Sequence, residues 1–113
     1  MGVFKQGDNW LKANIPPIMN STAYKNGGVI FLTWDESENS DGPIGMIALS
    51  PFAKVNYSNS IHYDHSSTLR TIQEIFGITP LLGGAASATD LSDFFTATAV
   101  TVNPPTNPKV VTK

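Results

Sequence analysis

The most constraining feature of the sequence is a run of apolar residues that ends in two acids. Residues 29–33 read Val-Ile-Phe-Leu-Thr, and Trp34, Asp35 and Glu36 follow directly. A short apolar run without alternation is typical of a strand covered on both faces, as in a parallel sheet. Ligands of open α/β sheets collect beyond the carboxyl ends of the strands. The run therefore predicts an α/β fold whose carboxylate pair could hold a cation, a phosphate–metal complex or a proton.

Length and composition exclude several classes of function. A chain of 113 residues is one domain or part of one. Its net charge of −2 and its seven scattered Lys and Arg residues argue against a nucleic-acid partner. No apolar run approaches the roughly 18 residues of a membrane span, and residues 1–5 lack the apolar core of an export signal. The absence of cysteine excludes a thiolate nucleophile and a thiolate metal site.

The first third of the chain predicts helical segments before the strand. We expect a capping turn at residues 7–9, a break at Pro16 and Pro17, and a short helix that ends near Ala23. Residues 25–28 read Lys-Asn-Gly-Gly and predict the turn into the strand. A second buried strand is expected within residues 44–50, followed by a loop or short edge strand over residues 54–61.

The clearest helix follows this loop. Asp64 and Ser66 are both suitable N-caps, and Gly77 is placed to end the helix. Its apolar residues fall on one face, namely Leu69, Ile72, Ile75 and Phe76. Asp90 is expected to cap a last short helical segment. Residues 96–113 are rich in Thr and Pro and predict a tail or linker after a segment of residues 1–95.

Two groups of residues could carry chemistry. The pair Asp35–Glu36 offers the oxygen ligands that hard cations prefer, although such a pair can also be a solvated turn. His65 stands at the start of the predicted helix, where the helix dipole favours phosphate oxygens. It can equally cap or pack. His62 is a weaker candidate, and Asp64 is either a cap or an orienting partner for a histidine. Capping explains Ser66 and Ser67 better than a nucleophilic role does.

Six blocks of residues follow one another along about residues 7–95. They are Gly7-Asp8-Asn9-Trp10-Leu11, Ser21-Thr22-Ala23-Tyr24-Lys25-Asn26-Gly27-Gly28, Phe31-Leu32-Thr33-Trp34-Asp35-Glu36, Ala48-Leu49-Ser50-Pro51-Phe52-Ala53-Lys54, Tyr63-Asp64-His65-Ser66-Ser67-Thr68-Leu69-Arg70-Thr71-Ile72 and Asp90-Leu91-Ser92-Asp93-Phe94-Phe95. Together, in this order, they resemble the C-terminal part of the phosphoesterase family that contains bacterial acid phosphatases and phospholipase C enzymes. That family belongs to the alkaline-phosphatase-like superfamily.

The resemblance implies the C-terminal part of an alkaline-phosphatase-like α/β sandwich with a central, mostly parallel sheet. It implies a metal-dependent hydrolase of phosphate esters with a divalent metal ion of unknown identity. Asp35 and Glu36 would be metal ligands and His65 a catalytic residue that faces the phosphate or belongs to the metal shell. Family members often have a glycine-rich stretch after the Asp-Glu pair, whereas this chain has Ser37-Glu38-Asn39-Ser40.

In such enzymes a hydroxyl nucleophile comes from earlier in the chain. We therefore expect this segment to lack a complete active site and to be inactive alone, with the N-terminal part of the same domain as its partner. Family members are commonly exported, which implies a secreted or periplasmic protein. Alternatives from other classes are a non-catalytic remnant of such a domain and a small ion-binding α/β module.

Overall fold

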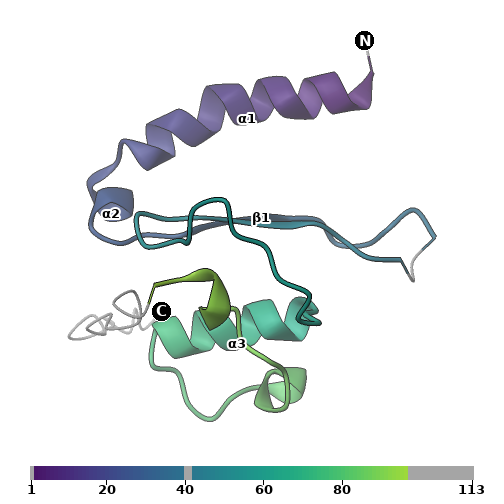
Figure 1. Ribbon diagram of the computed structural model, residues 1–113, viewed down its shortest axis with the longest axis vertical. Coiled ribbons are helices and arrows are strands. Elements are labelled where there is room, and N and C mark those ends of the chain that lie inside the picture. The colour runs from purple at the N-terminus through teal and green to yellow at the C-terminus, as the bar shows by residue number, and fades with distance from the viewer. Residues whose placement is uncertain (1, 40–41, 97–113) are drawn as a thin grey trace, which may run out of the picture. The chain divides into compact units, whose positions relative to one another are not determined.

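The computed structural model describes residues 2–39 and 42–96. The chain forms two compact units, Met1–Pro51 and Phe52–Lys113, whose elements are labelled in Figure 1. The first unit holds helices α1 (Val3–Met19) and α2 (Thr22–Lys25) and strands β1 (Ile30–Thr33) and β2 (Met46–Leu49). The second holds helix α3 (His65–Ile75) and the short 3-10 helices η1 (Gly83–Ala86) and η2 (Ser92–Phe94). The expected tail of residues 96–113 lies outside the described residues, apart from Thr96.

Helix α1 is continuous, so the predicted break at Pro16 and Pro17 is wrong. The helix runs from Val3 to Met19 and includes both prolines, and residues 7–9 lie within it. Each proline lacks an N–H and so removes one helical hydrogen bond. Both fall in the last turn, where the Pro16 carbonyl still accepts from the N–H of Asn20 at 3.0 Å. The prolines therefore weaken the end of the helix without ending it at residue 15.

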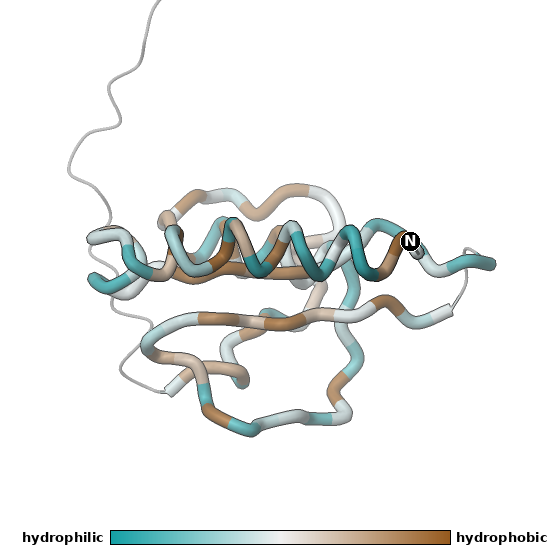
Figure 2. Tube along the Cα trace, turned by 90° about the horizontal axis from the view of Figure 1, so that it is seen from above, coloured by the Kyte–Doolittle hydropathy of each residue, from teal (hydrophilic) through white to brown (hydrophobic). Residues whose placement is uncertain are grey.

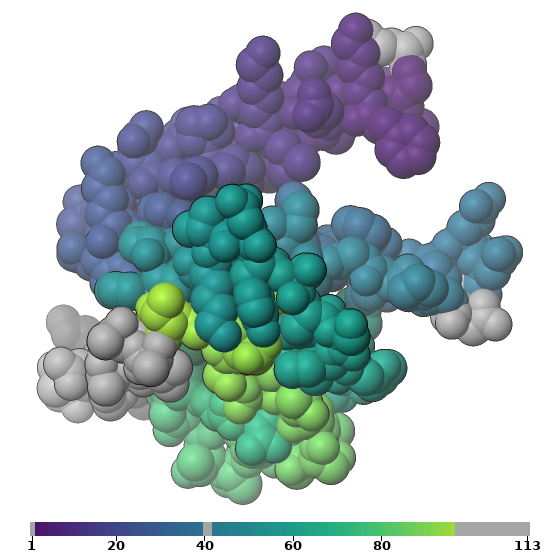
Figure 3. Space-filling view, in the orientation of Figure 1, coloured from purple at the N-terminus to yellow at the C-terminus, as the bar shows by residue number. Residues whose placement is uncertain are grey.

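Helix α1 is amphipathic and largely exposed. Hydrophobic and hydrophilic residues alternate around it in Figure 2, and Figure 3 shows its first turns standing clear of the rest of the first unit. Phe4 is 96% exposed and Trp10 is 59% exposed. Both are large apolar side chains that a complete domain would be expected to cover.

A tight turn leads from α1 into the sheet. Ser21 caps α2, because its Oγ accepts from the N–H of Tyr24 at 3.2 Å. Gly28 then approaches the backbone so closely that a Cβ there would lie 2.8 Å from the Ala23 carbonyl oxygen. Gly27 has a φ of 102°, which favours glycine. The turn predicted from the Lys-Asn-Gly-Gly sequence is confirmed.

The two strands form where the apolar runs predict them, but they pair antiparallel. Ile30 pairs with Leu49 and Thr33 with Met46, and the Thr33 hydroxyl donates to the Gly45 carbonyl at 2.7 Å. The described residues between β1 and β2 form no helix, and such a connection suits a hairpin rather than a parallel pair. Within residues 2–39 and 42–96 the sheet has two strands. The described chain is thus mixed helix and sheet, and the one strand pair it contains is not parallel.

Helix α3 begins and ends as the sequence predicts. Asp64 is the N-cap, and Gly77 has a φ of 61° just beyond the C-cap Phe76. The N–H of Gly77 donates to the Glu74 carbonyl at 3.2 Å, and that of Ile78 donates to the Gln73 carbonyl at 2.8 Å. These two bonds form a Schellman motif, which satisfies carbonyls that the helix end leaves free.

The buried residues of α3 are polar. Ser67, Thr71 and Gln73 are buried, whereas Leu69 is 40% exposed and Phe76 is 53% exposed. The Thr71 hydroxyl accepts from the N–H of Leu91 and the Gln73 side-chain oxygen from that of Leu82, whereas Ser67 bonds to Asp64. The predicted apolar face exists as a stripe on the helix, but in the described chain it is not the core.

Candidate functional site

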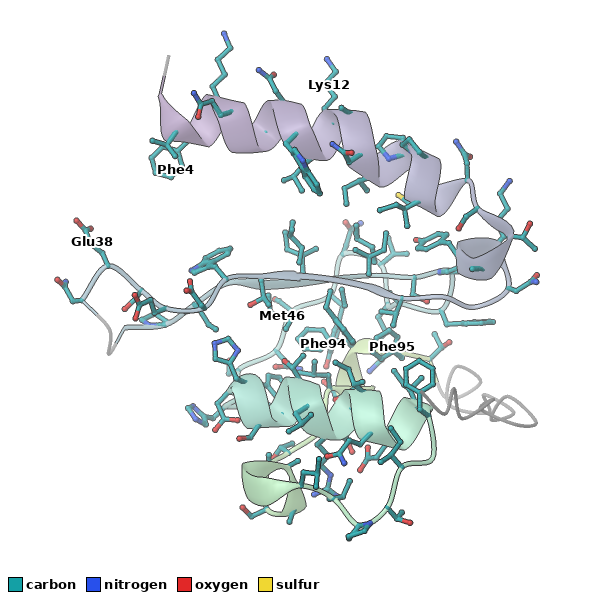
Figure 4. The ribbon with its side chains drawn as sticks, turned by 180° about the vertical axis from the view of Figure 1, so that it is seen from behind. Phe4, Lys12, Glu38, Met46, Phe94 and Phe95 are labelled. Carbon is teal, nitrogen blue, oxygen red and sulfur yellow. The ribbon has the colours of Figure 1, made fainter. Side chains whose placement is uncertain are left out.

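The predicted acids lie just beyond β1, in the loop that joins it to β2. β1 ends at Thr33, and Asp35 and Glu36 are both exposed. Asp35 Oδ1 accepts from the N–H of Glu36 at 3.0 Å, which fixes the backbone between the two carboxylates. Glu38 lies further out on the same loop (Figure 4). The two carboxylates are therefore presented to solvent by adjacent residues, as a cation ligand pair requires.

Close packing at the base of this loop positions the acids. The ring of Trp34 lies against the backbone of Gly45, and a Cβ at Gly45 would overlap it. Further out, the Ser37 hydroxyl accepts from the N–H of Gly42 at 2.8 Å and closes the loop. Trp34 is 51% exposed, so it covers one side of the loop base and leaves the carboxylates in contact with water.

His65 is the first residue of α3, and its position is set by a capping box. Asp64 Oδ1 accepts from the N–H of Ser67 at 3.0 Å, and Ser67 Oγ accepts from the N–H of Asp64 at 3.1 Å. The Asp64 carboxylate lies at the positive end of the helix dipole. A phosphate bound to the backbone amides there would meet this negative charge. The imidazole of His65, which is exposed, is the better group to contact a phosphoryl oxygen.

The serines beside His65 have structural roles. Ser67 is 2% exposed and belongs to the capping box. Ser66 packs against Gly84, where a Cβ would lie 2.5 Å from the Ser66 Oγ. Of the two N-caps that the sequence suggests, Asp64 is the observed one, and Ser66 lies inside the helix. His62 is exposed in the preceding loop.

The three predicted site residues come from both units. Asp35 and Glu36 belong to the first unit and His65 to the second. Among residues 2–39 and 42–96, no group of three or more His, Asp or Glu side chains could hold a metal ion. Asp35 and Glu36 fit a divalent cation by donor chemistry, since both are carboxylates. They supply two of the six or so ligands that such ions take.

A second polar cluster was missed by sequence reasoning. The Asp93 carboxylate accepts from the Tyr57 hydroxyl at 2.5 Å and from Asn59 Nδ2 at 2.7 Å, and Lys54 Nζ lies 3.4 Å from its other oxygen. The Tyr57 hydrogen bond is the main cause that lowers the pKa of Asp93. The partners are more than thirty residues apart in sequence, and no local pattern marks such a contact. The sequence signal was the acid within the Asp-Leu-Ser-Asp-Phe-Phe block.

The helices and the small antiparallel sheet of the described chain are consistent with a fragment of an α/β protein. The chain matches the phosphoesterase family over residues 3–79. Because the match covers more than half of the 113 residues, the chain belongs to the phosphoesterase family. No curated protein and no solved structure matched it. Family membership relates the chain to hydrolases and implies a phosphate-ester substrate.

The family match includes all three predicted site residues and ends before η1. The Asp93 cluster thus lies partly beyond it. Within the described part of the chain, no helix combines the length and apolar character needed to cross a membrane.

Proposed function

We propose that this chain is the C-terminal segment of a metal-dependent phosphoesterase of the bacterial acid phosphatase or phospholipase C type. The observation that carries the proposal is the position of Asp35 and Glu36. In a member of the phosphoesterase family, two exposed carboxylates lie within three residues of the end of β1. Ligands of open α/β sheets bind beyond the carboxyl ends of their strands. The sheet of the complete domain would be the mostly parallel sheet of an alkaline-phosphatase-like sandwich, with the hairpin β1–β2 as one part of it.

Each candidate residue has a distinct role in this proposal. Asp35 and Glu36 hold the divalent cation, which when bound neutralises phosphoryl charge and lowers the pKa of a nucleophile. His65 faces the phosphoryl group, where its imidazole can donate a hydrogen bond or a proton to an ester oxygen. The attacking hydroxyl comes from the part of the domain that precedes these residues.

The exposed apolar side chains support the proposal that the active domain contains more protein. Phe4 on α1 and Phe76 on α3 are 96% and 53% exposed, and the largest fully buried side chains are those of Leu91 and Ser67. We propose that the N-terminal part of the same domain covers these apolar surfaces and completes the site. The isolated chain would then show no turnover, and the whole protein would be secreted or periplasmic.

The test is hydrolysis of a chromogenic phosphate ester by the chain alone and by the longer product of its gene. The longer product should be active, and EDTA should abolish turnover until a divalent metal is restored. Asp35→Ala should lower turnover at least tenfold, because lost metal ligands and their supports usually cost about 10–100-fold. Glu38→Ala, which removes an exposed acid from the same loop, should stay within about twofold.

Four results would contradict the proposal. Asp35→Ala within about twofold of the parent would remove Asp35 from the metal centre. Turnover by the isolated chain would show that it contains a complete site. A gene without an upstream coding segment, together with cation binding by the inactive chain, would favour the small ion-binding module. An inactive longer product would favour the non-catalytic remnant.

A further inference from the structure

We propose that Asp93 is a positioning residue for His65, acting through the loop of residues 54–63 that leads into α3. The inference rests on the proposed catalytic role of His65. Asp93 lies outside the part of the chain that matches the phosphoesterase family. Its carboxylate accepts hydrogen bonds from three side chains of the loop.

The first step is the geometry of the carboxylate. One Asp93 oxygen accepts from both the Tyr57 hydroxyl, at 2.5 Å, and Asn59 Nδ2, at 2.7 Å. The other oxygen accepts from Lys54 Nζ at 3.4 Å. Hydrogen bonds to an ionised acceptor are about twice as strong as neutral ones. One residue therefore holds three points of the loop, and its oxygens are committed to these donors rather than to a substrate.

The second step is the aromatic packing around the neighbouring residue, Phe94 (Figure 4). The Tyr57 ring meets the Phe94 ring edge-on, with centroids 6.3 Å apart, and the Tyr63 ring lies 5.5 Å from it. Lys54 Nζ also lies 4.4 Å above the Tyr57 ring. The backbone adds a bond from the Lys54 N–H to the Phe94 carbonyl at 2.8 Å. The loop thus contacts residues 93–94 through both polar and aromatic side chains.

The third step connects the cluster to His65. Asn59 Nδ2, which donates to Asp93, also lies 3.1 Å from the Tyr63 hydroxyl, which accepts from it. Tyr63 is next to Asp64, the N-cap of α3, and two residues before His65. The Asn59 side-chain oxygen in turn accepts from the N–H of Ile61 at 3.1 Å. Asp93 thereby fixes Asn59 and Tyr63, and these two residues fix the backbone that delivers His65.

The experiment compares Asp93→Ala, Asp93→Asn and Glu74→Ala in this chain by NMR. Asp93→Ala should shift the His65 imidazole signals and reduce amide protection of residues 59–65 about tenfold. Asp93→Asn should restore part of the protection, since one amide oxygen can still accept from Tyr57 and Asn59 but the amide nitrogen cannot accept from Lys54. Glu74→Ala removes a carboxylate that pairs with Arg70 on the same helix, and it should leave His65 unchanged.

A milder variant guards against general unfolding. Tyr63→Phe keeps the ring against Phe94 and removes only the hydroxyl that accepts from Asn59. It should move the His65 signals in the same direction as Asp93→Ala, by a smaller amount. Combined with Asp93→Ala it should add little, because residues of one network are not additive. Unchanged His65 signals in Asp93→Ala, or the same response in Glu74→Ala, would overturn the proposal.

Turnover separates this proposal from the proposed function. In the longer gene product, Asp93→Ala should lower kcat about tenfold and leave KM within about twofold, with Asp93→Asn intermediate. A longer product without any activity would refute the proposed function, while the NMR comparison would still decide whether Asp93 positions His65. An active Asp93→Ala variant with unchanged kcat would refute the positioning role alone.

Discussion

Different kinds of interaction stabilise each of the two units of the molecule. In the first, the hairpin is fixed by backbone pairing between β1 and β2, and none of its described residues is buried. In the second, the buried Thr71 and Gln73 of α3 accept from the backbone N–H groups of Leu91 and Leu82, and the buried Ser67 belongs to the capping box with Asp64. The first unit carries the candidate metal ligands, and the second carries His65.

Because of this difference, substitutions in the two units should have different effects on activity and on stability. The acids beyond β1 are exposed, so their replacement should affect chemistry more than folding. The buried Thr71 hydroxyl and the Gln73 side-chain oxygen each accept from a backbone N–H, so their replacement leaves those donors unpaired. Mutations can therefore test the contrast directly, and the largest effect is expected in the second unit.

Leu91→Ala should produce the largest loss of stability. Leu91 is 1% exposed, and truncation of a buried leucine costs about 2–5 kcal/mol through lost burial and the cavity left behind. Amide exchange of α3 should accelerate accordingly. Ile47→Ala on β2, which is 51% exposed, should cost well under half as much. Equal losses at the two positions would break the contrast between the units.

Thr71→Val should produce the next largest loss of stability. The Thr71 hydroxyl accepts from the N–H of Leu91 at 2.8 Å and donates to the Ser67 carbonyl at 2.8 Å. Valine has nearly the same shape but leaves the buried Leu91 donor unpaired, which costs about 1–3 kcal/mol. The Leu91 amide itself should lose protection in hydrogen exchange. Thr68→Val, at a half-buried position on the same helix, is the matched control and should have a smaller effect. Equal effects of the two variants would argue that valine acts through helix propensity alone.

Local sequence signals predicted the elements of both units well. The apolar runs predicted the two strands, the Lys-Asn-Gly-Gly sequence predicted the turn before β1, and Asp64 and Gly77 predicted the ends of α3. Each of these is decided by residues within a few positions. The continuous helix α1 was missed because proline weakens a helix without ending it when it falls in the last turn.

Non-local features could not be read in the same way. The antiparallel pairing of β1 and β2 depends on the path of the loop between them, which an apolar run does not specify. The hydroxyl of Thr71 was not singled out, because its partner is the backbone of Leu91, twenty residues on. For the candidate site, the sequence pattern named the two acids and His65 as candidates. The Asp93 cluster could not be predicted, because its side chains come from distant parts of the sequence.

Gly7→Ala should have a small, stabilising effect in the first unit. Gly7 lies inside α1, and a Cβ there would meet nothing within 4 Å. Alanine in a helix interior is favoured over glycine by about 0.5–1 kcal/mol. Amide exchange along α1 should slow. Gly45→Ala is the contrasting variant, because its Cβ would overlap the Trp34 ring, and it should instead change tryptophan fluorescence and loosen the hairpin. A neutral Gly45→Ala would mean that Trp34 does not hold the base of the loop.

The smallest expected effect is a change in the titration of Tyr57 at the edge of the second unit. The hydrogen bond to Asp93 is the main cause that raises the pKa of Tyr57 above its ordinary value of 10.0, and the same bond lowers the pKa of Asp93 below 3.8. Because the folded Asp93 pKa is lowered, its contribution to stability is present above pH about 4 and is lost as the pH falls through the lower, folded pKa. Because the folded Tyr57 pKa is raised, its contribution is present below pH about 10 and is lost as the pH rises through the folded pKa.

The hydrogen bonds to Asp93 should therefore persist between about pH 4 and about pH 10. Asp93→Ala should shift the Tyr57 ring titration, followed by NMR, to lower pH, since both the hydrogen bond and the neighbouring negative charge are lost. Glu74→Ala removes an equal charge on α3 and should leave the Tyr57 curve in place. If Asp93→Ala does not move that curve, then Tyr57 does not donate to Asp93 in solution, and the loop before His65 must be held by the aromatic contacts with Phe94 instead.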